Sequence, residues 1–172
     1  CKQVENNLDK EGVFHVEIAY LPDILKLYSF DTFCQEHLTY FSFISFNNLI
    51  NQTKFKIIDY HRNGINGGSI NFDIVFKNSK YKPNKNKLQK IINTENKLGI
   101  NNSSTFKKFY KDLIYKAKKI NSKILEIKKK NMTIYGYGAS TKGNVLLQLC
   151  NLDDKIIDGI YDVNKEKFNL YT

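Results

Sequence analysis

Glu36 and His37 stand next to each other in a polar and aromatic stretch, and together they could act as an acid and base pair. Histidine is the natural general base near neutral pH, and a carboxylate beside it can raise its basicity. Tyr40, three residues further on, adds another polar group. Because neighbours in sequence need not contact each other, a surface histidine in a polar connector would show the same pattern, and both interpretations stay open.

The segment Asn66-Gly67-Gly68-Ser69 could bring backbone N–H groups close to a ligand. Paired glycines allow the main chain to approach an anion or a substrate hydroxyl, and Ser69 would add a donor. An ordinary hairpin turn uses the same residue types. The sequence does not decide between a binding turn and a structural one.

A glycine-rich loop over 135–144, YGYGASTKGN, joins a predicted strand to a predicted helix. Such a loop presents a helix N-terminus to an anion, and Lys142 supplies a positive charge. Lys142 precedes Gly143, so this is no Walker A motif, and Thr141 takes the place of the third glycine of G-x-G-x-x-G. The loop fits either a phosphate or sugar-nucleotide contact or a purely structural turn.

The elements that would position these segments follow from hydrophobic period and from turn residues. Alternation of apolar and polar residues predicts strands over 12–20, 54–61 and 69–76, the last two as an antiparallel hairpin. We expect helices over 22–28 and 44–50, then 88–98 closed by Gly99, and a long one from a Ser103 or Ser104 cap to about Asn131. A buried strand over 132–137, a helix over 141–150 and a strand over 156–161 would open a doubly wound parallel sheet.

Composition narrows the classes of protein that the chain could be. Its 172 residues carry a net charge of +10, and between Phe106 and Lys130 ten lysines face two carboxylates. Arg62 is the single arginine of the chain. We interpret the lysine-rich segment as a solvated helix face and expect no nucleic-acid partner. No stretch is apolar enough to span a membrane, and no signal peptide is evident. Three cysteines and three histidines without metal-ligand spacing predict a cytoplasmic protein with no metal site in this chain.

Taken in order, four segments match one known family: 12–21, FDTFCQEHLTYFS over 30–42, NGGSI over 66–70, and YGYGASTKGNVLLQ over 135–148. Together they resemble the sugar C-methyltransferases, which use S-adenosylmethionine to methylate nucleotide-linked keto-deoxysugars. The resemblance implies an enzyme with an N-terminal zinc module, a central S-adenosylmethionine domain and a C-terminal Rossmann-like domain. The zinc ligands and the main cofactor-binding loop would precede this chain, which we expect to be a fragment and inactive alone.

The resemblance also implies a fold and its division. We expect an α/β chain: the end of a class I methyltransferase-like domain over 1–77, a linker over 78–86, and part of a Rossmann-like domain over 87–172. The linker is polar, basic and interrupted by Pro83.

Carried over position by position, the resemblance makes His37 the catalytic base, Glu36 its neighbouring acid and Tyr40 a further polar contact. The expected substrate-binding residues lie in the same matched motifs; they are Cys34, Gly67, Gly68, Ser69, Tyr137, Ala139, Ser140, Lys142, Gly143 and Asn144. The sequence departs from the family at Cys34-Gln35, where Tyr-His is common, and at Asn66, where His is common.

The expected reaction is transfer of a methyl group to a carbon beside the keto group of a nucleotide-linked deoxysugar. One alternative is a nicotinamide-dependent oxidoreductase built on the 136–143 loop, with Asp162 as the ribose ligand. A second is a non-catalytic basic module that binds through the lysine helix. The oligomeric state does not follow from the sequence.

Overall fold

The computed structural model describes residues 2–170, which form two compact units. The first unit comprises residues up to 29 together with 39–105, and the second comprises 30–38 together with the residues from 106 onward. Both units mix helices and strands, so the fold is α/β as expected. No helix among residues 2–170 combines the length and the apolar character needed to cross a membrane.

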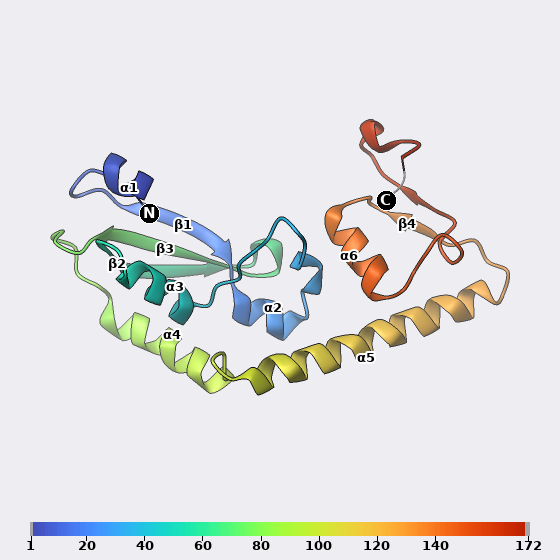
Figure 1. The fold of residues 1–172 in the computed structure, drawn as a ribbon, viewed down its shortest axis with the longest axis horizontal. Coiled ribbons are helices and arrows are strands. Elements are labelled where there is room, and N and C mark those ends of the chain that lie inside the picture. The colour runs from blue at the N-terminus through green and yellow to red at the C-terminus, as the bar shows by residue number, and fades with distance from the viewer. Residues whose placement is uncertain (1, 171–172) are drawn as a thin grey trace. The chain divides into compact units, whose positions relative to one another are not determined.

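The first unit contains a three-stranded antiparallel sheet in the order β1-β3-β2 (Figure 1). The strands are β1 (Phe14–Ala19), β2 (Phe55–Asn63) and β3 (Ser69–Phe76). A short 3-10 turn, Ile65–Gly67, joins β2 to β3, which confirms the predicted hairpin. The central strand β3 carries Ile70, Phe72 and Ile74 on one face, and all three are fully buried.

Two helices, one before β2 and one after β3 in the sequence, pack on the apolar face of this sheet. The helices of the unit are α1 (Lys2–Asn7), α2 (Leu21–Leu27), α3 (Phe43–Asn51) and α4 (Lys85–Leu98). Phe43 and Phe46 of α3 and Ile91 of α4 share one core with β3, and the Phe46 ring stacks on Phe72 at 4.6 Å. Because burying one such side chain stabilises the fold by about 1.5–3 kcal/mol, this core holds α3 and α4 to the sheet.

A β-bulge in β2 sets which side chains reach this core. Ile57 pairs with Ile74, but the next pair is Asp59 with Asp73, so β2 has one residue more than β3 at this point. The extra residue shifts the alternation of β2 by one position, so Tyr60 rather than Asp59 faces the core opposite Phe72, and Arg62 lies opposite Ile70.

The expected linker over 78–86 lies inside the first unit, and the boundary between the units falls in the next helix, at 105/106. The reason is that α4 belongs to the core: it buries Ile91 and Glu95, and Asn84 donates its backbone N–H to the Ile58 carbonyl. Gly99 ends α4 in the left-handed conformation (φ 67°), as predicted. The assignment of the two parts to methyltransferase and Rossmann-like domains stays a prediction.

The second unit holds most of α5 (Ser103–Lys128), β4 (Tyr135–Tyr137), α6 (Thr141–Leu149) and β5 (Gly159–Tyr161), together with the 3-10 turns Phe30–Thr32 and Lys165–Lys167. β4 and β5 are parallel, as expected for strand, glycine turn, helix, strand. A small core of Ala117, Cys150 and Leu152 joins α5 to the end of α6.

Two expectations for this unit are wrong. The strand over 132–137 is not buried: only 135–137 is extended, and Tyr135 and Tyr137 are 53% and 82% exposed. Its sheet has two strands in the described structure, and the face that carries Tyr135 and Tyr137 stays open. The cap of α5 is Asn102 rather than a serine, because Ser103 is already helical and the Asn102 side chain accepts from the Ser104 N–H at 3.0 Å.

Candidate functional site

His37 lies in an exposed loop of the second unit, and its Nδ1 faces Thr32. Its Nδ1 is 3.1 Å from the Thr32 carbonyl oxygen and 3.3 Å from the Thr32 hydroxyl. The backbone N–H of His37 donates to the Cys34 carbonyl at 3.1 Å, which closes the turn. Since a carbonyl only accepts, Nδ1 carries the hydrogen of the neutral ring and the basic lone pair is on Nε2. A lone pair of this kind could accept a proton.

Glu36 and Cys34 contact each other in the same loop. A hydrogen bond from the Cys34 thiol lowers the pKa of Glu36 below its usual value, and the Glu36 backbone and the nearby His37 act in the same direction. Glu36 is therefore ionised at neutral pH beside the imidazole that it would support. Tyr40 belongs to the first unit and is half-buried.

The 66–69 turn of the first unit depends on positive φ angles. Asn66, Gly67 and Gly68 have φ of 53°, 86° and 131°. A Cβ on Gly68 would lie 2.6 Å from the Cβ of Asp23, so glycine is needed for this close approach. The Ser69 hydroxyl is buried and donates to the Ile65 carbonyl at 3.1 Å, so its hydrogen serves the turn itself. The backbone shape fits a binding turn and a structural turn alike.

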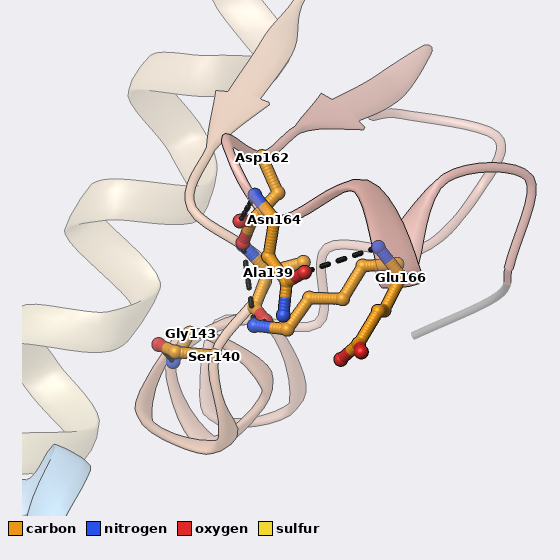
Figure 2. A network of polar contacts seen from close by, with 7 residues as sticks. Ala139, Ser140, Gly143, Asp162, Asn164 and Glu166 are labelled. Carbon is orange, nitrogen blue, oxygen red and sulfur yellow. Dashed lines mark hydrogen bonds and ion pairs between the residues drawn. The ribbon is translucent and has the colours of Figure 1, made fainter.

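The glycine-rich loop of the second unit is tied to the end of β5 by a polar network (Figure 2). Ala139 donates its N–H to Asp162 Oδ2 at 2.8 Å, and Lys167 Nζ donates to the Ala139 carbonyl at 2.5 Å. Ser140 caps α6 by accepting the Gly143 N–H at 3.1 Å. Backbone N–H groups of Asn164 and Ala139, then Lys167, lower the pKa of Asp162. Asp162 thus supports the loop, which weakens the oxidoreductase alternative that needed this carboxylate for a ribose.

The remaining loop residues are open to a ligand to different degrees. Lys142, at the start of α6, is 44% exposed, and its Nζ lies 3.9 Å from Asp31 Oδ2. Asn144 is half-buried in the first turn of α6, and Tyr137 is exposed at the end of β4. The structure therefore brings the segment that carries His37 and the glycine-rich loop into one unit, joined by Asp31 and Lys142.

Two residues, Asp31 in the second unit and Glu95 in the first, make contacts that were not predicted from the sequence. Asp31 was part of the matched motif but had no assigned role, and its contact with Lys142 spans distant parts of the chain. Glu95 is fully buried in α4, where its carboxylate accepts hydrogen bonds from Tyr20, Phe43 and Ile44. A signal for Glu95 existed, because it follows Ile91 by four residues on the apolar face of a helix.

No group of three or more metal-ligating side chains comes together within residues 2–170. The side chains in this part of the second unit include an imidazole and carboxylates, which suit proton transfer. The ammonium group of Lys142 suits anion binding.

Comparison with known proteins agrees with the resemblance seen in the motifs. A family model described as the C-methyltransferase C-terminal domain matches residues 64–172. The chain is also 31% identical over 150 residues to the C-methyltransferase NovU of Streptomyces niveus, an alignment that covers 84% of this chain and 34% of that protein. The chain therefore spans about a third of the length of this relative. We conclude that the chain belongs to the C-methyltransferase family, with residues 64–172 corresponding to its C-terminal domain.

Proposed function

We propose that the complete protein is an S-adenosylmethionine-dependent C-methyltransferase that methylates a carbon beside the keto group of a nucleotide-linked deoxysugar. The observation that carries this proposal is the orientation of His37. Its Nδ1 is held by the Thr32 carbonyl, so Nε2 has the lone pair, and the ionised Glu36 lies beside it in sequence. Family membership supports the methyl transfer, and the chemistry of the site supports a proton abstraction.

In this proposal His37 starts the reaction. Nε2 removes the proton from the carbon next to the ketone, and the C–H electron pair becomes an enolate. The enolate carbon would then accept the methyl group, and the electron pair of the methyl–sulfur bond would remain on the donor's sulfur. S-adenosylmethionine supplies the electrophilic methyl group when bound. The proton on His37 is afterwards lost to solvent, so atoms and charge balance.

The residues described here fit the sugar side of the site rather than the cofactor side. Lys142 and the backbone at the start of α6 offer positive potential to the phosphates of the nucleotide. We propose that the main loop for S-adenosylmethionine, and the zinc module, lie outside this chain. We also place the enzyme in the cytoplasm, which would keep the free thiols of Cys34 and Cys150 reduced.

Deprotonation can be tested apart from methyl transfer. In deuterated solvent, without the methyl donor, the complete enzyme should exchange the alpha proton of its keto-sugar substrate for deuterium. His37→Ala should slow this exchange and turnover by ~10²-fold or more while sugar affinity changes by a few-fold only. His15→Ala is the matched control, because His15 is an exposed histidine of β1 that pairs with Asp73 in the sheet. Exchange at the wild-type rate in His37→Ala would assign the base to another residue.

A further inference from the structure

The carboxylate of Glu95 is buried at the junction of three elements of the first unit. Oε1 accepts from the Tyr20 hydroxyl at 2.8 Å and from the Phe43 N–H at 2.6 Å, and Oε2 accepts from the Ile44 N–H at 2.9 Å. A buried carboxylate is costly unless donors surround it, and here two of the three donors are the first N–H groups of α3. The positive end of the α3 dipole adds to this attraction. Glu95 therefore fixes where α3 begins.

Tyr20 connects the same junction to the 66–69 turn. Its backbone N–H donates to the Gly68 carbonyl at 3.1 Å, and its ring lies under the Arg62 guanidinium at 4.8 Å. Arg62 in turn holds both oxygens of Asp23, which packs against Gly68. Burial and the Glu95 carboxylate raise the pKa of Tyr20 above its usual range, so its hydroxyl stays a donor at neutral pH.

Tyr20 also contacts the segment that follows His37. A parallel bridge pairs Tyr20 with Phe41, and the Leu21 N–H donates to the Phe41 carbonyl at 3.0 Å. Phe41 comes four residues after His37 and one after Tyr40. Ser42 then caps α3 with a reciprocal pair of hydrogen bonds to Ser45. Tyr20 therefore links two segments that carry predicted site residues, 40–44 and the 66–69 turn. Tyr20 is itself held by its buried hydrogen bond to Glu95.

We propose that Glu95 and Tyr20 are positioning residues, which hold the 40–44 segment and the 66–69 turn in the one arrangement that the reaction needs. The inference rests on the function proposed above. Neither residue has to touch the substrate, and both act through the backbone of the segments that they anchor. A displacement of reacting groups by about 1 Å can cost on the order of 10²-fold in rate, so a small loss of order here should appear in turnover.

The test uses Tyr20→Phe and Glu95→Gln in the complete enzyme. Tyr20→Phe deletes one hydrogen bond and leaves the ring under Arg62, whereas Glu95→Gln replaces an accepting oxygen by a donor that faces other donors. Each variant should lower both turnover and alpha-proton exchange by about 10- to 100-fold. The double variant should be no slower than Glu95→Gln alone, because the two changes remove one shared bond.

Ile91→Ala is the matched control for plain loss of stability. Ile91 lies one turn before Glu95 on α4 and is buried in the same core as Tyr20 and Phe43, so its truncation leaves a cavity but removes none of the hydrogen bonds of the junction. It should lower the melting temperature and leave the exchange rate per folded molecule at the wild-type value. Circular dichroism and thermal melting give the folded fraction of every variant.

Three outcomes would overturn the inference. If Tyr20→Phe melts earlier yet exchanges protons at the wild-type rate, the junction only stabilises the fold; this variant alone decides if Glu95→Gln does not fold. If the double variant is much slower than both single variants, the two residues do not act through their shared bond. If the wild-type enzyme shows no exchange, the proposed function fails, and the positioning role fails with it.

Discussion

Gly68→Ala tests whether the 66–69 turn depends on glycine. The new Cβ would lie 2.5 Å from Asp23 Oδ2 and 2.6 Å from Asp23 Cβ, at a φ of 131°. Holding a residue with a side chain at such a φ costs about 1–3 kcal/mol, and forcing extra atoms into a packed site costs about as much again. Because Asp23 Cβ is attached to the backbone of α2, it cannot turn aside. We therefore expect the first unit to lose about 2–6 kcal/mol of its free energy of unfolding.

Hydrogen exchange of the β3 amides measures this loss in the complete protein, since exchange of core amides reports the opening of their own unit. A loss at the lower bound should accelerate exchange by about 30-fold. Gly64→Ala is the control in the same turn, because Gly64 has a φ of −93° and nothing within 4 Å of a built Cβ. That change should be neutral or stabilising by about 0.4–1 kcal/mol. Equal exchange rates in the two variants would refute the steric argument.

Other consequences follow from the second unit and from the domain assignment. The pKa of Asp162 is lowered in the folded state. The ionised carboxylate therefore stabilises the fold above its unfolded pKa, and this stabilisation is lost as pH falls through the folded pKa. The melting temperature of Asp162→Asn should accordingly fall less on acidification than that of the wild type. Lys142→Ala should raise the Michaelis constant for the sugar nucleotide more than it lowers turnover, and an unchanged constant would make the loop structural. Glu36→Gln should slow alpha-proton exchange less than His37→Ala does. Calorimetric titration of this chain alone should show binding of neither S-adenosylmethionine nor zinc, and micromolar affinity for either would contradict the proposed domain division.

Local pattern predicted the three strands of the first unit and its helices α2, α3 and α4, whereas α1 (Lys2–Asn7) was not predicted. Alternation in β3 puts Ile70, Phe72 and Ile74 on one face, and the structure buries all three. The C-terminus of α4 was also predictable, since Gly99 has the conformation that most other residues avoid. The docking of α4 was not predictable from its polar preceding segment, because it depends on Ile91 meeting residues of β3 and α3.

For the site, sequence identified the segments but not the contacts within them. His37 was recognised from its neighbour Glu36, whereas the group that orients its ring is the Thr32 carbonyl, a backbone atom that no side-chain pattern reports. The pairing of Asp31 with Lys142 joins residues 111 positions apart, and nothing local specifies it.

The bulge in β2 gives this strand one position at which a residue can be lost without a change of register. Deletion of Ile58 would remove the extra residue and leave a regular ladder, in which Asp59 still pairs with Asp73 and Tyr60 still pairs with Phe72. The side chains after it would therefore keep their faces of the sheet, with Tyr60 toward the core and Arg62 over the Tyr20 ring. The central strand β3 has no such extra residue, so loss of one of its residues would move the side chains beyond the gap to the opposite face. Among natural or engineered variants of this chain, single-residue deletions should therefore be more frequent at 58 than within 69–76.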